Sequence, residues 1–399
     1  MQELIVIQKQ DKSKQICLAE NGILKEYYEE IENKKCLEGN VYIGKIENVL
    51  PGMQAAFVDI GEEKKAFLHI RDILPKKSTI TGNKNEEYEK YKIQDYIKPN
   101  QCILVQVKKD INNLKGPRIS THIQIPGRFI VLLPENDFIT ASQKIENNEE
   151  KKRLIDIVSN IKKDEKIGVI IRTAAEGKDE QQIERDIKTT IEKWKKLQED
   201  FKKEQSKAPK ILKKSETILE KILLDIADNK LEKILVNDEL IKEKIEEILK
   251  EIKEEKDDII IEMQKQNLED KYDMQSQIEK IQNRKIWLKC GGFITIDKTE
   301  ALTAIDVNSG KFTGNENLEK TVLKVNKEAS CEIAKQLRLR DIGGIIIIDY
   351  IDMEEESSKE EVLDTLKINL KEDRAKIQIM QFTKLNLLEM TRKHMFGKE

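Results

Sequence analysis

Three polar residues in the last quarter of the chain have the side chains needed for metal-assisted hydrolysis. In ALTAIDVN (301–308), side chains alternate between the two faces of a predicted strand, which puts Asp306 and Asn308 on one face. In IIIIDY (345–350), Asp349 ends a second predicted strand, at the edge where open α/β sheets bind ligands. If the two strands are neighbours, the two carboxylates converge.

Two carboxylates at one sheet edge repel each other, and a divalent cation relieves that repulsion. Ligation by oxygen alone, without Cys or His nearby, favours Mg²⁺, with Mn²⁺ as a second candidate, over Zn²⁺. Such an ion polarises a phosphoryl oxygen and activates water, so the pair predicts phosphodiester hydrolysis. The alternative, which the pattern leaves open, is that both aspartates only end strands or cap turns.

Residues 286–399 are predicted to form a compact α/β unit. GGFITIDKTEALTAIDVN predicts a β-hairpin, and AKIQIMQF is expected to be the last strand. Four consecutive isoleucines predict a central strand at 345–349 that is buried on both sides. Apolar residues at spacings of three and four predict a helix between them. They are Leu318, Val322, Val325, Ala329, Ile333 and Leu337.

The rest of the chain divides into segments of different character. Short alternating runs punctuated by glycines over 39–125 predict a small β-barrel. Residues 1–38 contain strands too short to fold alone, so they must pack with a later segment. Residues 210–285 predict helix, then a strand at KILVND, then a highly charged helix.

Composition narrows the class of protein. The chain has 399 residues, enough for two or three units, and a net charge of -3. This lack of basic excess is mild evidence against nucleic-acid binding, although local basic patches can exist in a balanced total. Five scattered cysteines indicate reduced thiols. Without a secretory signal or an apolar run of ~20 residues, we expect a soluble cytoplasmic protein with no membrane span.

Several segments resemble the ribonuclease E/G family, in that family's order. The resemblance covers nearly the whole chain and is weakest over 76–98 and 236–280. The matching segments are AAFVDIGEEKKAFLHI (55–70), GPRISTHIQIPGRFIVLLP (116–134), IIRTAAEG (170–177), EALTAIDVNSGKFTG (300–314), EIAKQLRLRDIGGIIIIDYIDM (332–353), DRAKIQI (373–379) and LLEMTRK (387–393).

The resemblance implies a multidomain α/β architecture. An RNase H-like fold, expected to be structural only, would combine residues 1–38 and 210–285. An OB-fold RNA-binding barrel (39–125) and a 5′-sensor domain (126–209) would be inserted into it. Residues 286–399 would form a DNase I-like α/β catalytic domain.

By the same resemblance, Asp306 and Asp349 are the catalytic residues that bind the metal, and Asn308 helps to position the scissile phosphate or the attacking water. The implied enzyme is a Mg²⁺-dependent endoribonuclease that hydrolyses single-stranded, A/U-rich RNA. Its products would carry a 5′-monophosphate and a 3′-hydroxyl, with water as the nucleophile. It would act in rRNA and tRNA processing and in mRNA decay.

Two further groups of residues are implied to bind RNA. Phe57 and Phe67 would stack on unpaired bases, and Lys115 would contact the RNA backbone. Without the resemblance, each phenylalanine would be interpreted as a core residue and the lysine as a solvated surface residue.

Arg172 and Thr173 would bind the RNA 5′-monophosphate and so stimulate cleavage, with Gly127 and Val131 shaping the pocket wall. The alternative for Arg172 is a surface ion pair.

The chain departs from the family at three places. No arginine stands near Gln143 and Lys144, where some relatives have one, and Lys376 replaces an arginine. The sequence ends at Glu399 without the paired-cysteine motif that shares a zinc ion between two chains, so we expect no zinc and leave a homodimer open.

Two other functions stay open. A non-catalytic RNA-binding or assembly protein could retain the fold, although the intact Asp306, Asn308 and Asp349 argue against it. A metal phosphohydrolase could act on a non-RNA ester, but a barrel with Phe57 and Phe67 favours a polymeric, single-stranded substrate.

Overall fold

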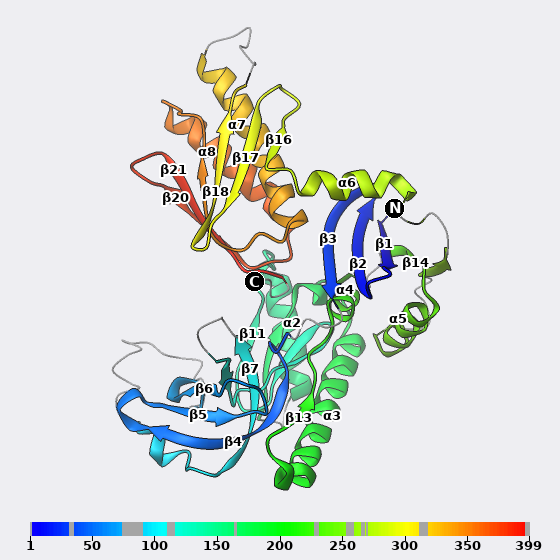
Figure 1. Cartoon of the computed structure of the whole chain (residues 1–399), viewed down its shortest axis with the longest axis vertical. Coiled ribbons are helices and arrows are strands. Elements are labelled where there is room, and N and C mark those ends of the chain that lie inside the picture. Colours follow the sequence, from blue (N-terminus) through cyan, green and yellow to red (C-terminus); the bar gives the residue numbers. More distant parts are fainter. Residues whose placement is uncertain are drawn as a thin grey trace. The chain divides into compact units, whose positions relative to one another are not determined.

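The computed structural model divides the chain into two compact units, Lys35–Asp225 and a second unit that joins Met1–Lys34 to Ile226–Glu399 (Figure 1). Both units combine helices and strands, so the predicted mixed α/β class is confirmed. The structure describes residues 2–31, 36–73, 91–109, 116–162, 166–226, 231–252, 259–264, 268, 270–310 and 318–395.

The unit Lys35–Asp225 contains a closed five-stranded barrel of the OB-like type. The strand order is β4-β5-β6-β8-β7, and pairing of β4 with β7 closes the sheet. Apolar side chains of alternate residues, among them Val58, Leu68 and Ile119, fill its interior. The small β-barrel predicted in this part of the chain is therefore confirmed. Its strands are β4 (Val41–Leu50), β5 (Ala55–Asp59), β6 (Ala66–His69), β7 (Cys102–Lys109) and β8 (Arg118–Ser120), with β13 (Lys210–Lys213) paired to β4.

A small second sheet in the same unit has the order β11-β12-β10-β9. Its apolar side chains share one core with helices α2 and α3. Helix α3 begins with a capping box between Asp179 and Gln182. The elements are β9 (Ile125–Pro126), β10 (Ile130–Leu133), β11 (Ile139–Ala141), β12 (Gly168–Ile171), α2 (Asn148–Lys162), α3 (Glu180–Glu204) and α4 (Ile218–Ile226).

In the other unit, the N-terminal strands join a sheet with the order β15-β14-β1-β2-β3. Strand β1 pairs in parallel with β14, so the N-terminal segment packs with a later one, as predicted. The elements are β1 (Gln2–Gln8), β2 (Ser13–Glu20), β3 (Ile23–Ile31), β14 (Leu231–Val236) and β15 (Ile260–Met263), with α5 (Glu239–Ile252) and α6 (Met274–Ile281).

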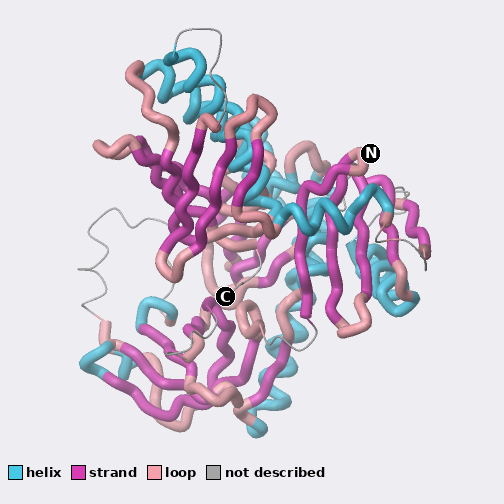
Figure 2. Tube along the Cα trace, turned by 45° about the horizontal axis from the view of Figure 1, so that its top comes forward, coloured by secondary structure: helices cyan, strands magenta, loops and turns pink. Residues whose placement is uncertain are grey.

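A six-stranded sheet, which we call the C-terminal sheet, has the order β16-β17-β18-β19-β21-β20. The predicted hairpin is β17–β18, and α7 connects β18 to its parallel neighbour β19 (Figure 2). The elements are β16 (Lys285–Trp287), β17 (Phe293–Lys298), β18 (Leu302–Asn308), β19 (Gly344–Asp349), β20 (Ile377–Phe382), β21 (Leu387–Arg392), α7 (Leu318–Leu339) and α8 (Glu356–Leu370).

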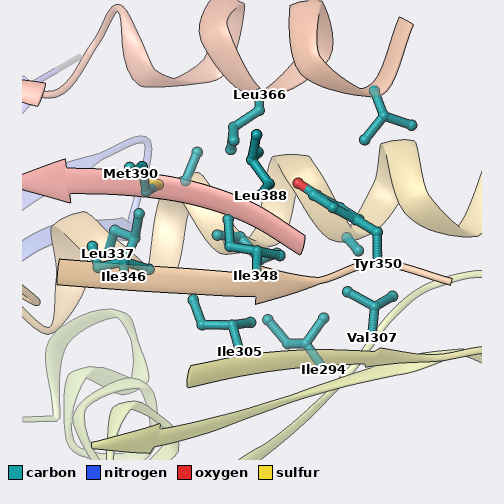
Figure 3. Packing of buried hydrophobic residues seen from close by; sticks show 14 of the residues in the cluster. Ile294, Ile305, Val307, Leu337, Ile346, Ile348, Tyr350, Leu366, Leu388 and Met390 are labelled. Carbon is teal, nitrogen blue, oxygen red and sulfur yellow. The ribbon is translucent and has the colours of Figure 1, made fainter. Parts of the chain in front are cut away.

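Helices α7 and α8 cover one face of the C-terminal sheet. Figure 3 shows Ile305, Ile348 and Leu388 of the strands on the side of the sheet where Leu337 and Leu366 project from the helices. The apolar stripe predicted for α7 is buried from Val322 to Leu337. The side chain of Leu318 lies outside the described residues.

Two predictions for this sheet are wrong. The strand at 345–349 is buried on one face only, because both helices pack on the same side and Ile345 leaves 50% of its surface exposed. AKIQIMQF is not the last strand, since Leu387–Arg392 follows it and lies between β19 and β20.

Within the described residues, no helix is apolar over the length that crossing a membrane requires.

A buried ion network ties β21 to the ends of both helices. Arg392 is fully buried and donates to Asp373 and to Asp341, each at 2.8 Å, and to the carbonyl of Ile342. Asp341 follows α7 and Asp373 follows α8. The network therefore links β21 to the segments that follow α7 and α8.

We expect Arg392→Met to lower the free energy of unfolding by about 3–5 kcal/mol, because two buried carboxylates lose their cation. Urea denaturation measures this loss. The control Arg284→Met removes an exposed arginine that pairs with Asp297, and should cost less than ~1 kcal/mol. Equal losses in the two variants would show that burial does not strengthen the Arg392 network.

Candidate active site

The two aspartates predicted to form a metal site lie side by side. Strands β18 and β19 run parallel, and Asp306 is the in-register partner of Asp349. Both side chains are exposed on the face opposite the helices. The prediction that the two strands are neighbours is confirmed, so two carboxylates converge at one place on the open face.

Asn308 is held against the same carboxylate pair. Its side-chain amide donates a hydrogen bond to Oδ2 of Asp306 at 2.6 Å. After β18, Gly310 adopts φ +61°, and a side chain there would collide with the carbonyl of Gly291. The chain therefore turns tightly directly after Asn308, which keeps this side chain beside the aspartates.

The surroundings of Asp349 raise the pKa of its carboxyl. Partial burial raises the pKa of its carboxyl above the ordinary value of 3.8, and the negative charges of Asp306 and Asp352 raise it further. Sequence reasoning missed Asp352. The available signal was the second aspartate in the segment IDYID, three residues after Asp349.

Helix α7 fixes the backbone beyond Asp349. Figure 3 shows Tyr350 turned toward the helices, and its hydroxyl lies 2.7 Å from Oγ of Ser330. The buried side chain of Asn326 donates to the carbonyl of Ile351 at 2.8 Å and accepts from its N–H at 3.2 Å. These contacts hold the end of β19 in place, so Asp349 is presented from a rigid segment.

The carboxylate pair fits a hard divalent cation. Among the described residues, no group of three or more His, Cys, Asp or Glu side chains is arranged to hold a metal. Mg²⁺ keeps several waters and needs only one or two carboxylates, whereas structural zinc needs four closely placed ligands. A cation between Asp306 and Asp349 would also relieve the repulsion between their two negative charges. The donor set therefore suits Mg²⁺ or Mn²⁺.

The barrel places its two predicted RNA-binding phenylalanines together. Phe57 and Phe67 pair in register on β5 and β6, with ring centroids 6.1 Å apart in a T-shaped arrangement. Both are half-buried and alternate with core residues such as Val58, so they lie outside the barrel core. His69 continues this face, 6.4 Å from Phe67. Lys115 lies outside the described residues.

The predicted 5′-phosphate residues lie in neighbouring segments. Arg172 donates from its side chain to the carbonyl of Gly127, and from its backbone N–H to Phe129, each at 2.8 Å. Thr173 follows directly and begins a short 3₁₀ helix. Val131 lies on β10, where it pairs with Ile170 immediately before this segment on β12.

Two aspartates that sequence reasoning missed hold this region. The carboxylate of Asp186 accepts the backbone N–H groups of residues 128, 129 and 130, and any side chain at position 127 would collide with it. Asp225 forms an ion pair with Arg172, so the ion pair expected in the alternative interpretation is present. Both aspartates lie on helices far from the loop in sequence, and no local pattern marks them.

Comparisons of the sequence with known proteins found a matching family and several similar proteins. Residues 124–395 match the model of the Ribonuclease E/G family. The chain is 38% identical over 379 residues to ribonuclease G of Escherichia coli (strain K12), covering 95% of this chain and 77% of that protein. It is 38% identical over 382 residues to ribonuclease G of Haemophilus influenzae, with the same coverage. It is 33% identical over 360 residues to ribonuclease E of Nostoc sp., covering 89% of this chain and 51% of that protein.

The chain therefore belongs to the ribonuclease E/G family, a family of enzymes whose named relatives are ribonucleases. The resemblance stated from the sequence motifs is confirmed.

In the metal-free protein, we expect Asp306→Asn to bring the pKa of Asp349 down toward 3.8, because the neighbouring negative charge is removed. NMR titration of the Asp349 carboxyl carbon measures this shift. Because ionisation of Asp349 then costs less in the folded state, the free energy of unfolding at pH 7 should be higher in the variant than in wild type. Asp352→Asn should give a smaller fall. An unchanged pKa in Asp306→Asn would mean that the two carboxylates do not face each other.

Proposed function

We propose that this chain is a Mg²⁺-dependent endoribonuclease that hydrolyses single-stranded RNA at the pair Asp306 and Asp349. The observation that supports this most directly is the in-register placement of the two carboxylates on the open face of the C-terminal sheet. Membership of the ribonuclease E/G family supports RNA as the substrate. Polar groups grouped on an otherwise open sheet face suit a polymeric substrate better than a small enclosed one.

Asp306 and Asp349 would hold Mg²⁺, or Mn²⁺ in its place. When bound, such an ion polarises a phosphoryl oxygen and lowers the pKa of water. Asn308 donates to Asp306 and so restricts rotation of that carboxylate, while α7 holds the backbone after Asp349. The chain's own contribution is thus a fixed pair of anions beside an amide that can orient the scissile phosphate. Attack by water would leave a 5′-monophosphate and a 3′-hydroxyl.

We further propose that the barrel binds A/U-rich RNA through Phe57, Phe67 and Lys115. The partly exposed pair of rings supports this, since aromatic side chains on barrels of this kind stack on unpaired bases. The C-terminal unit over 286–399 would be DNase I-like, and residues 1–38 with 210–285 would be RNase H-like.

A 5′-sensor over 126–209 would favour RNA that carries a terminal monophosphate. Arg172 already donates to Gly127 and Asp225, and among the described residues none accepts a hydrogen bond from its Nε. A terminal phosphate would bind the remaining N–H groups of Arg172, and the Thr173 hydroxyl would add a further donor. Val131 would contact the terminal base. An incoming phosphate would compete with Asp225 for the guanidinium, so binding would be sensitive to the charge of the RNA end.

The same assignment suggests roles in rRNA and tRNA processing and in mRNA decay, in the cytoplasm. The five free thiols fit a reducing compartment. We include a homodimer of the chain in this proposal.

We expect Asp349→Asn to lower kcat at least ~10²-fold while RNA binding stays within about threefold, because one anion of the metal site is lost. The substrate is a short 5′-monophosphorylated, A/U-rich RNA, assayed with Mg²⁺ and then with EDTA. Asp364→Asn, an exposed aspartate of α8, should cleave normally. Normal turnover by Asp349→Asn would refute the metal assignment. RNA binding by the wild-type protein without cleavage would favour the non-catalytic alternative.

For the sensor, we expect Arg172→Ala to reduce the ratio of kcat/KM for 5′-monophosphorylated over 5′-hydroxylated RNA to about one. The guanidinium supplies the charge and the paired N–H groups that distinguish these ends. Arg172→Lys should keep an intermediate preference, since it retains the charge but loses the planar fork. A ratio that stays at the wild-type value in Arg172→Ala would place the sensor elsewhere.

A further inference from the structure

Beside the carboxylate pair, the open face of the C-terminal sheet has a row of aromatic side chains. Trp287 on β16 pairs in register with Phe293 on β17, and Phe293 pairs in register with Asn308 on β18. Residues that pair in register project from the same face of a sheet. Trp287, Phe293 and Asn308 therefore form one row, and Asn308 is already a member of the candidate active site.

The next row on this face contains the acidic pair. Lys285 pairs with Thr295, Thr295 with Asp306, and Asp306 with Asp349. Rows separated by two residues along a strand are about 7 Å apart. The aromatic row thus lies directly alongside the carboxylates, on the same rigid sheet.

The aromatic row is ordered by its own contacts but is not buried. The rings of Trp287 and Phe293 are 5.3 Å apart at 62°, a T-shaped contact. Nζ of Lys285 lies 3.5 Å from the ring centroid of Phe293 and 4.2 Å from that of Trp287. Trp287 nevertheless leaves 60% of its surface exposed. A large aromatic surface with a positive charge beside it is thus available to a ligand.

We propose that Trp287 and Phe293, together with Lys285, form a subsite for an unpaired nucleobase next to the scissile phosphate. Trp287 stacks on the base, and the ammonium group of Lys285 lies close enough to interact with a phosphate of the same nucleotide. Proteins that hold single-stranded nucleic acid combine aromatic faces with positive charge in this way. The proposal rests on the proposed function, because the acidic pair defines where the scissile phosphate lies.

A nucleotide suits this patch better than a protein surface does. The apolar part consists of two side chains and is flanked by Lys285, Thr295 and the acidic pair, whereas a stable protein interface needs about 800 Å² per partner. Because the patch shares a sheet with the carboxylates, it would influence which nucleotide lies beside the bond that is cut. The Phe57–Phe67 pair belongs to the other unit, Lys35–Asp225, and is not part of this patch.

Tryptophan fluorescence tests the stacking directly. The chain has two tryptophans, so Trp194→Phe leaves Trp287 as the only one, and Asp349→Asn prevents cleavage of the added RNA. A 5′-monophosphorylated, A/U-rich RNA with Mg²⁺ should quench this fluorescence. Single abasic sites are then moved along the RNA. Quenching should be lost only at one or two positions that adjoin the bond cut by the wild-type protein.

Cleavage kinetics give a second, independent measurement that needs no change at Trp194. Trp287→Leu should lower kcat/KM about tenfold, whereas Trp287→Phe, which keeps an aromatic ring, should stay within about threefold of wild type. Leu385→Ala removes another exposed apolar side chain, 79% exposed, and should have no effect. On RNA that is abasic at the sensitive position, Trp287→Leu and wild type should cleave equally.

Each contrary result has a distinct meaning. The subsite is wrong if RNA does not quench the fluorescence of Trp287 and if Trp287→Leu cleaves as fast as wild type. Cleavage by the wild-type protein would still support the proposed function in that case. Failure of wild type to cleave RNA with Mg²⁺ overturns the proposed function, whatever the fluorescence. If sedimentation shows that Trp287→Leu dissociates an oligomer while quenching is absent, the patch is a contact between copies of the chain, and the subsite is wrong.

Discussion

The in-register pairing of β18 with β19 is the constraint on which the candidate site depends. Side chains alternate along a strand, so a slip of one residue would turn Asp349 toward the helices and Ile348 toward the open face. Burial of Ile305 and Ile348 against α7 and α8 makes such a slip costly. The hydrophobic core on one side of the sheet therefore determines the placement of two charges on the other side, and no contact between the charges is needed to hold them together.

The crossover that parallel pairing requires has a second consequence. Parallel neighbours need a long connection, and here α7 provides it across the face opposite the carboxylates. The same helix supplies Ser330 and Asn326, which hold the chain just beyond Asp349. Because both covering helices pack on one side, the other face keeps its polar and aromatic residues accessible. The packing of α7 and α8 on one face of the sheet thus both holds the end of β19 in place and leaves the opposite face accessible.

The sequence predicts local features better than long-range ones, and the residues show why. Spacing alone predicts the apolar stripe of α7, the β17–β18 hairpin and the shared face of Asp306 and Asn308. Adjacency of Asp306 and Asp349 needs the family resemblance or the structure, because 42 intervening residues separate them in the sequence. The isoleucine run misleads because Ile345 is exposed, which depends on where the helices pack. Asp186 and Asp225 contact a distant loop, and Trp287 shares a row with Asn308 only through sheet order, with Phe293 between them, so no local signal marks them.

A pair of carboxylates with a cation cannot by itself select one bond of an RNA chain, because all phosphodiester groups have the same chemical structure. Selectivity must come from groups that read bases or chain ends. Under the proposed function, such groups would lie at three places: two pairs of aromatic side chains, each in register on adjacent strands, and one guanidinium held by a loop carbonyl and a carboxylate. Stacking accepts any base, although strength differs between bases, so it yields preferences and not a strict sequence code. Under the proposed function, these contacts would therefore give a relaxed preference for single-stranded RNA.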